Sequence, residues 1–142
     1  MNISFSWLSD YLKIPAPTSK FFDDLTERSV EVEHVLNYAK KFSKIVVGEV
    51  KKIEKHPSAD RLSVVTIDTG KSAGEFSLVC GGINLAVGRK VAVALPGALV
   101  KHDQEDFEIQ KTVIRGVESA GMICSSEELG FMKAGEKEIL VL

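Results

Sequence analysis

The chain has 142 residues, of which 44% are hydrophobic and 27% are charged, and its formal net charge is −2. This length is enough for one ordinary folded domain, or for a domain with a small appendage. The near-neutral charge excludes a strongly basic nucleic-acid binder. A local basic patch is compatible with it, because attraction to phosphates depends on where the charges lie.

Charged residues are clustered along the chain. Six lysines lie within sixteen residues: Lys40, Lys41, Lys44, Lys51, Lys52 and Lys55. An acidic run follows later in the chain: Asp103, Glu105, Asp106 and Glu108. Two interpretations stay open for both clusters, which are either solvated faces or charged contact surfaces.

Cysteine usage indicates that the protein lies in a reducing compartment, and hydropathy indicates that the chain has no membrane-spanning segment. Cys80 and Cys124 are far apart and form no CxxC pattern, so neither a zinc ribbon nor a thioredoxin-type site is supported. Both follow apolar residues, where cysteine behaves as a small hydrophobic residue. The N-terminus has no basic region before an apolar core, and no apolar run approaches the ~20 residues of a membrane span. We therefore expect a cytoplasmic protein.

Residues 1–40 predict a small α/β segment. Apolar residues at helical spacing follow a candidate cap at Ser6 and predict a first helix: Trp7, Leu8, Tyr11 and Leu12. Pro15 and Pro17 end this helix, because proline lacks a backbone donor and restricts the residue before it. A second short helix begins near a cap at Thr18 or Ser19, and alternation over 30–33 predicts a strand. Since so small a unit buries little by itself, we expect it to pack on the rest of this chain or on another subunit.

Residues 41–142 predict a barrel of short strands. The apolar and β-branched segments are 45–53, 62–69, 76–80, 90–95, 107–114 and 139–142. Glycine or Pro-Gly ends several of them, and Gly48 marks a bulge or a sharp coil in the first. Ser125 and Glu128 form a capping box that opens a short helical turn. The predicted fold class is therefore mainly β, a five-stranded OB-fold barrel with a small N-terminal helix and strand segment, and a sandwich is the alternative.

Catalytic and metal-binding patterns are missing from the sequence. The three histidines, His34, His56 and His102, are widely separated and form no HxxxH or HxE pattern. Neither GxSxG nor a P-loop occurs, and Gly81-Gly82 lacks the strand-to-helix context of a phosphate cradle. We expect no catalysis by this chain alone.

The loop after the first predicted strand carries one candidate binding residue. In His56-Pro-Ser-Ala-Asp-Arg-Leu62, proline favours an extended approach, and Ser58 and Asp60 bond nearby backbone groups. Arg61 then projects near a loop that frames the ligand face of OB-folds. The alternative interpretation is a well-made turn with a surface arginine.

The closing stretch from Lys111 to Gly130 carries the other candidates. Lys111 and Arg115 have the charge to meet phosphates, Ser119 has a hydroxyl that can bond sugar or backbone groups, and Met122 has a side chain that can lie against a base. A structural alternative stays open, in which the serine caps, the glycine turns and the methionine fills the core. Few aromatic residues fall on predicted strands, so recognition of backbone shape is favoured over stacking of several bases.

Several segments, in order and spacing, resemble the bacterial phenylalanyl-tRNA synthetase beta-subunit family and its tRNA-binding OB domain. They are His56-Pro-Ser-Ala-Asp-Arg-Leu62, Val79-Cys-Gly-Gly-Ile-Asn84, Val93-Ala-Leu-Pro-Gly-Ala98, and Arg115-Gly-Val-Glu-Ser-Ala-Gly-Met-Ile-Cys-Ser-Ser126 with Glu128-Leu-Gly130. The opening 3–12, with Glu31-Val-Glu33, resembles that family's N-terminal segment. The family usually has Asn where Ser58 stands and often Lys at Arg61, and both differences keep polarity or charge.

The resemblance implies a piece of a longer subunit, and the apolar end over 139–142 fits that expectation. The implied enzyme is an α2β2 complex that joins phenylalanine to its tRNA with ATP and magnesium, while this piece holds no cofactor and no catalytic residue. The implied partners are the phenylalanine-specific tRNA and the alpha subunit. The RNA-binding residues that we predict on this basis are Lys51, Arg61, Asn84, Lys111, Arg115, Ser119 and Met122.

Charge balance leaves three hypotheses about function. Residues 44–142 carry 13 Lys and Arg against 14 Asp and Glu, which argues against tight independent tRNA binding, because non-specific affinity comes largely from phosphate neutralisation. The chain is expected to be an accessory tRNA-binding and assembly module of the synthetase. The alternatives are a docking module for the alpha subunit and other beta domains, and a free-standing tRNA-binding OB protein, against which the N-terminal extension argues.

Overall fold

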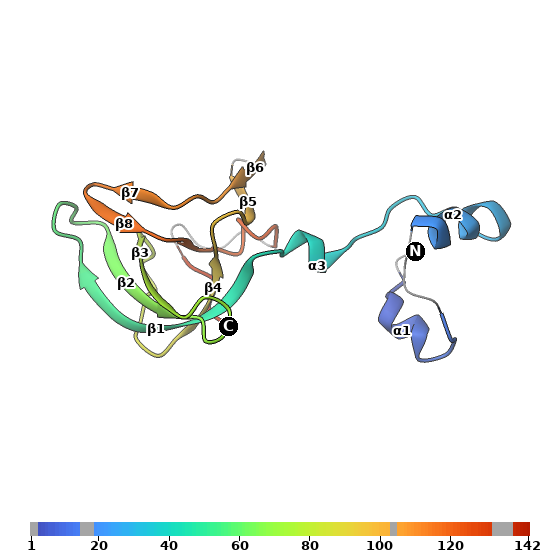
Figure 1. Ribbon diagram of the computed structural model, residues 1–142, viewed down its shortest axis with the longest axis horizontal. Coiled ribbons are helices and arrows are strands. Elements are labelled where there is room, and N and C mark those ends of the chain that lie inside the picture. The colour runs from blue at the N-terminus through green and yellow to red at the C-terminus, as the bar shows by residue number, and fades with distance from the viewer. Residues whose placement is uncertain (1–2, 15–18, 103–104, 132–137) are drawn as a thin grey trace. The chain divides into compact units, whose positions relative to one another are not determined.

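The computed structural model describes residues 3–14, 19–102, 105–131 and 138–142. The chain divides into two compact units, Met1–Asn37 and Tyr38–Leu142 (Figure 1). The domain boundaries expected from the sequence, 1–40 and 41–142, stay a prediction. Each unit is described separately below.

The smaller unit contains two helices, α1 (Phe5–Ser9) and α2 (Ser19–Arg28). The cap of α1 is Ser4, whose Oγ accepts a hydrogen bond from Trp7 N at 3.4 Å. The predicted cap, Ser6, lies inside the helix, because a capping oxygen must reach an amide two or three residues ahead at the helix start. The residues that were expected to end α1 and to cap α2, Pro15, Pro17 and Thr18, lie outside the described residues.

The strand predicted over 30–33 is wrong: the structure assigns no strand to these residues. Their amides bond back to α2 instead, Val30 N to Leu25 O at 3.0 Å and Val32 N to Thr26 Oγ1 at 3.1 Å. Alternating residues make a strand only where a neighbouring strand accepts their hydrogen bonds. Among the described residues of this unit no such neighbour exists.

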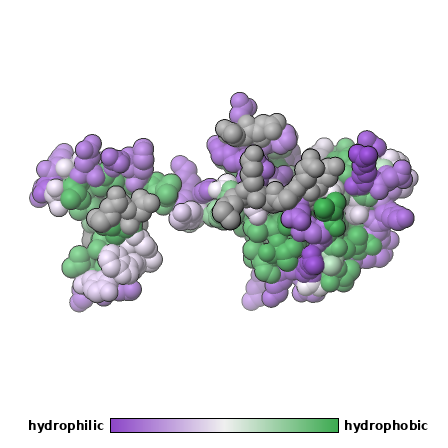
Figure 2. Space-filling model, turned by 180° about the vertical axis from the view of Figure 1, so that it is seen from behind, coloured by the Kyte–Doolittle hydropathy of each residue, from purple (hydrophilic) through white to green (hydrophobic). Residues whose placement is uncertain are grey.

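The described part of Met1–Asn37 contains no buried residue. Its aromatic rings touch one another, with Phe5 and Phe21 centroids 5.7 Å apart and Trp7 and Tyr11 centroids 5.4 Å apart. Figure 2 shows green, apolar atoms on the surface of this unit. A unit with this surface gains little hydrophobic stabilisation from its own contacts.

The larger unit consists of a short helix followed by strands. In chain order its elements are α3 (Tyr38–Lys41), β1 (Ile45–Lys55), β2 (Ser63–Asp68), β3 (Glu75–Cys80), β4 (Lys90–Ala94), β5 (Leu99–His102), β6 (Glu105–Glu108), β7 (Thr112–Ile114), β8 (Val117–Ser119) and β9 (Met122–Ile123). Five of the strands form one antiparallel sheet in the order β3-β2-β1-β4-β9. The pairs β5-β6 and β7-β8 are separate hairpins.

Strand β1 bends so that it pairs with β4 along its first half and with β2 along its second. Of the two expectations for Gly48, a bulge or a sharp coil, the bulge is wrong, because the irregularity in the register falls between Val50 and Lys52. Gly48 serves close packing instead, since a Cβ there would overlap Ile67 Cγ2 and lie 2.9 Å from Val93 Cγ2. The absence of a side chain therefore lets the sheet curl tightly at this point.

The curled sheet closes toward a barrel where β3 meets the segment between β8 and β9 (Figure 1). Ala120 N donates to Ser77 O at 3.2 Å, and Val79 N donates to Ser119 Oγ at 3.0 Å. These bonds satisfy donors on the otherwise open edge of β3. The mainly β, OB-type fold class predicted from the sequence is confirmed.

Two of the predicted strands differ from the observed ones. The segment 107–114 is not one strand, because Ile109 turns inward and exchanges backbone hydrogen bonds with Gly97 and Ala98, which separates β6 from β7. The final strand is reduced to a single bridge between Val91 and Val141. The capping box is confirmed: Ser125 N donates to Glu128 Oε2 at 2.6 Å, and Glu128 N donates to Ser125 Oγ at 3.2 Å.

The core has two clusters of buried apolar residues, and each contains one cysteine. Cys80 lies with Val50, Ile67 and Leu78, while Cys124 lies with Ala94 and Leu129. Both thiols are free and buried. Burial raises the pKa of both, and raises the pKa of Cys124 from its ordinary 9.0 to about 12.

This shift predicts a loss of stability at alkaline pH. Above pH 9 the unfolded chain releases the Cys124 proton while the folded chain holds it, so the free energy of unfolding falls as pH rises toward about 12. The slope from this thiol is about 1.4 kcal/mol per pH unit. Urea unfolding from pH 8 to 10.5 measures it, and the Cys124→Ala variant should show a shallower pH dependence. Equal slopes in the two proteins would contradict the assignment.

Candidate functional site

A groove of about 1390 Å³ runs along the side of the larger unit where the barrel closes. Its walls come from the loop before β2, the end of β3, the stretch from β6 to β7, the start of β9 and the C-terminal segment. Apolar side chains line much of it: Leu62, Val79, Ile83, Phe107, Ile109, Ile114, Met122, Ile123 and Ile139. Figure 2 shows a broad green apolar area on one face of the larger unit.

Acidic side chains outnumber basic ones in this groove. The acidic lining residues are Asp60, Glu108, Glu127, Glu128 and Glu138, and the basic ones are Arg61 and Lys111. Lys111 Nζ is paired with Glu118 of β8, which offsets its charge. This excess of negative charge opposes a run of phosphates along the groove.

His56 joins the loop after β1 to the β7-β8 hairpin. The ring is buried, and Nδ1 accepts a hydrogen bond from Ser58 N at 3.1 Å. Because Nδ1 accepts, Nε2 carries the proton and donates to Ile114 O at 3.0 Å. The turn expected at His56–Leu62 is thereby held against the hairpin next to its tip, which carries Arg115.

Arg115 occupies the tip of the β7-β8 hairpin in a strained conformation. Ile114 pairs with Val117, and the two residues between them have positive φ, 48° for Arg115 and 87° for Gly116. Such a turn favours asparagine or glycine at its first central position, so an arginine there costs conformational energy. Its side chain is exposed and only loosely held, with Nη1 3.5 Å from Ser58 O. A charged side chain is thus displayed at the end of a rigid hairpin.

Ser119 and Met122 occupy structural positions beside the groove. Ser119 is 1% exposed, and its Oγ accepts from Val79 N while donating to Gly121 O at 2.9 Å. Met122 is half-buried and packs against the second core cluster. These contacts agree with the alternative interpretation of the sequence, in which the serine bonds backbone groups and the methionine fills the core.

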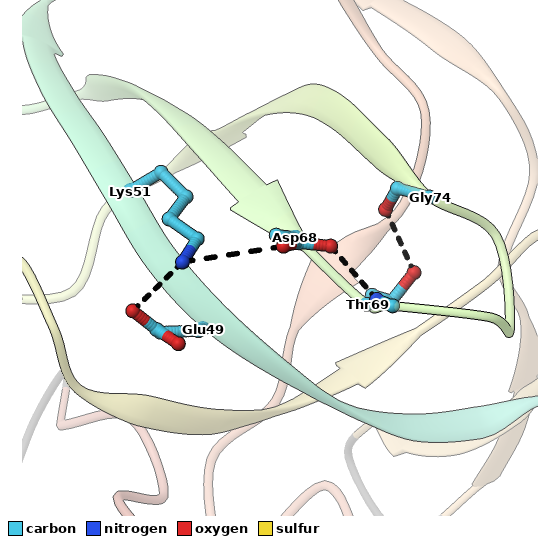
Figure 3. A network of polar contacts seen from close by, with 6 residues as sticks. Glu49, Lys51, Asp68, Thr69 and Gly74 are labelled. Carbon is cyan, nitrogen blue, oxygen red and sulfur yellow. Dashed lines mark hydrogen bonds and ion pairs between the residues drawn. The ribbon is translucent and has the colours of Figure 1, made fainter.

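Asn84 and Lys51 lie away from the groove lining. Asn84 binds one residue of the C-terminal segment twice, since Nδ2 donates to Ile139 O at 3.0 Å and Oδ1 accepts from Ile139 N at 2.9 Å. Lys51 lies on β1 between Glu49, at 2.9 Å, and Asp68, at 4.0 Å (Figure 3). The hydrogen bond to Glu49 raises the pKa of Lys51.

The structure thus brings together part of the predicted RNA-binding set. Arg61, Lys111, Ser119 and Met122 line one groove, and Arg115 stands beside the same loop. The role of His56 in joining the loop to the hairpin was not predicted from the sequence. The pairing of His56 with Ile114 spans 58 positions, and no local pattern signals a contact at that separation.

The described residues contain neither a metal-binding cluster nor a membrane-spanning helix. Over those residues no group of three or more His, Cys, Asp or Glu side chains is arranged to hold a metal ion. In the same described ranges, no helix has the length and apolar character needed to cross a membrane.

Comparison with protein families identifies the larger unit. A family model described as "Putative tRNA binding domain" matches residues 45–142, from the first residue of β1 to the end of the chain. The chain belongs to this family of tRNA-binding domains. The matched range contains the groove, the His56 loop and the Arg115 hairpin.

Relatives extend the similarity over the N-terminal unit as well. The "Phenylalanine--tRNA ligase beta subunit" of Porphyromonas gingivalis is 39% identical over 144 residues, which covers 99% of this chain and 18% of the relative. The protein of that name from Oceanobacillus iheyensis is 44% identical over 131 residues, or 92% of this chain and 16% of the relative. The resemblance to the beta-subunit family is confirmed, and the chain spans less than a fifth of these relatives.

Among solved structures, a "MetRS related protein from Pyrococcus horikoshii" superposes with a TM-score of 0.49 at 18% identity. The superposition covers 77% of this chain and 87% of that chain.

Ser119→Ala tests whether the groove wall depends on the serine hydroxyl. The change leaves the Val79 amide buried without its acceptor, which should lower the free energy of unfolding by about 1–3 kcal/mol. Ser77→Ala is the matched control on the exposed face of β3 and should change it by less than about 0.5 kcal/mol. Chemical denaturation measures both, and equal values would remove the structural role of Ser119.

Proposed function

We propose that this chain is the accessory tRNA-binding module of a phenylalanyl-tRNA synthetase beta subunit. The family match over 45–142 and the relatives' names support this proposal. The observation that carries it is Arg115, an exposed cation at positive φ on a rigid hairpin tip. A side chain held there at a conformational cost is well suited to a contact outside the protein.

The proposed RNA contact is the rim of the groove at the end where the His56 loop meets the β7-β8 hairpin. Arg61 and Arg115 are exposed there and would bind phosphates, while the excess of acidic residues in the lining disfavours a phosphate run through the groove itself. Met122, half-buried in the groove wall, would lie against a base or sugar. For Lys51, Asn84, Lys111 and Ser119, RNA contact remains a prediction, since each already has a protein partner.

The complete enzyme is part of the proposal. In it the beta subunit would act with an alpha subunit in an α2β2 complex in the cytoplasm and join phenylalanine to its tRNA with ATP and magnesium. The described residues of this chain offer no metal-binding group, so ATP and magnesium would be held elsewhere in the enzyme. The contribution of this chain would be binding and orientation of tRNA.

Binding of phenylalanine-specific tRNA to the 142-residue chain tests the proposal. Affinity should be measurable at ~50 mM salt and fall steeply at higher salt, because phosphate contacts release counterions. The double variant Arg61→Gln/Arg115→Gln should bind about tenfold more weakly and with a smaller dependence on salt. Fluorescence anisotropy with labelled tRNA measures both quantities.

The matched control is Lys71→Gln, which removes an exposed cation from the turn between β2 and β3. This variant should bind tRNA like the unchanged chain. Absence of tRNA binding at ~50 mM salt would overturn autonomous recognition, and equal losses in the control and the double variant would overturn the location at the rim.

A second function, docking of other polypeptides, is favoured by the N-terminal unit. Its described residues include no buried residue, and several large apolar side chains are exposed: Ile3, Trp7, Tyr11, Leu12, Val30, Val35 and Leu36. Exposed apolar surface on this scale marks interaction sites. The occupant that we propose is the alpha subunit or the rest of the beta subunit.

Trp7 reports directly on docking, because it is 54% exposed and the chain has one tryptophan. Adding the alpha subunit or the remaining beta chain should shift its emission to shorter wavelengths as the indole leaves water. Mixing experiments would use tryptophan-free partners, with the Trp7→Phe chain as the blank. Unchanged emission together with separate elution on a sizing column would rule out docking through this unit.

A further inference from the structure

The lysine run of the sequence divides into two groups in the structure. On β1, Lys51 is paired with Glu49 and Asp68, and Lys52 is paired with Glu54 at 3.0 Å. Before β1, Lys41 and Lys44 take part in no ion pair with any residue that the structure describes. Lys41 and Lys44 therefore place uncompensated positive charge at the start of the larger unit, next to α3.

Three aromatic rings form a row at the same place. Tyr38 and Phe42 stack with an interplanar angle of 12° and centroids 5.9 Å apart. Phe42 contacts Phe131, from the far end of the chain, at 5.7 Å. Phe42 is half-buried and anchored on the second core cluster, whereas Tyr38 is 58% and Phe131 is 54% exposed. The two outer rings, Tyr38 and Phe131, are therefore exposed to solvent, and the inner ring, Phe42, is fixed by the core.

Lys41 is held against this row. Its Nζ lies 5.1 Å from the Phe42 centroid and 5.9 Å from the Phe131 centroid, within the range of a cation–π interaction. The side chain also passes over Gly130, where an added Cβ would lie 3.1 Å from Nζ. Lys44 lies over Gly97 in the same manner, so close that a Cβ there would overlap it. Two glycines thus make room for two lysine side chains.

We propose that Tyr38, Lys41, Phe42 and Phe131 form an aromatic–lysine platform that binds an unpaired nucleotide of RNA. The base stacks on an exposed ring, and Lys41 binds the adjoining phosphate. This subsite lies outside the groove and outside the RNA-binding set predicted from the sequence. It rests on the proposed tRNA-binding function and adds single-stranded RNA as the form that is bound.

Charge favours RNA over a protein partner at the platform. Aromatic rings with an adjacent cation are the combination that single-stranded nucleic acids use, because every base has a π face and every linkage has a phosphate. A purely apolar docking surface would not place uncompensated lysines among its rings, since burying them costs desolvation energy. The acidic groove has the opposite balance of charge.

The test compares a single-stranded RNA of about ten nucleotides with a blunt duplex of the same sequence, both binding to the 142-residue chain. Tyr38→Ala and Phe131→Ala should each weaken single-strand binding about five- to a hundredfold and leave its salt dependence unchanged. Lys41→Gln should lower the slope of log K against log salt by about 0.7. Duplex binding should change little in the two aromatic variants, because its bases are not free to stack.

Val87→Ala removes an exposed apolar side chain outside both the platform and the groove, and Lys71→Gln is the matched cation control. Neither should alter single-strand binding.

If the unchanged chain binds tRNA but the platform variants bind both RNAs normally, the platform is wrong while the proposed function stands. If the unchanged chain binds neither tRNA nor the oligonucleotide, both are wrong. A loss of the Trp7 emission shift in the platform variants, with RNA binding intact, would assign the rings to a protein partner.

Discussion

The hydrogen bond from Val79 N to Ser119 Oγ, with its neighbour from Ala120 N to Ser77 O, is the constraint on which the larger unit depends. It joins the free edge of β3 to the segment between β8 and β9, which belongs to the opposite end of the sheet order. Gly121 is required beside it, because a Cβ there would lie 2.7 Å from Ala94 O. With that closure in place, the groove wall, the β7-β8 hairpin and the His56 loop acquire fixed positions.

Charge is distributed unevenly over this closed scaffold, although the net charge of the chain is only −2. The groove is acidic, its rim carries Arg61 and Arg115, and Lys41 and Lys44 lie before β1. Each region favours a different ligand chemistry. A near-neutral protein is thereby able to offer phosphate contacts at chosen points without the high general affinity of a basic protein.

Much of the fold was predictable because its signals are local. β2, β3 and β4 coincide with apolar runs that are bounded by glycine, Pro-Gly or turn residues. The Ser125–Glu128 capping box needs only four residues. Errors occurred where pairing decided the outcome. Residues 30–33 alternate like a strand but have no partner, and 107–114 is divided because Ile109 bonds to Gly97 and Ala98. No local pattern reports whether a neighbouring strand is available.

By itself, the sequence determined the class of the fold, the family and the residue types available for binding phosphates, because these depend on composition and on motif order. Only the tertiary structure decided which residues are available for contact. Ser119, Asn84 and His56 bond to groups 40 to 58 positions away, whereas Arg115 remains exposed at a hairpin tip. Tyr38 and Phe131 likewise lie in one ring row with Phe42 although they come from opposite ends of the larger unit. Contacts of this separation follow from how the sheet curls and closes, and that geometry is a property of all the strands together.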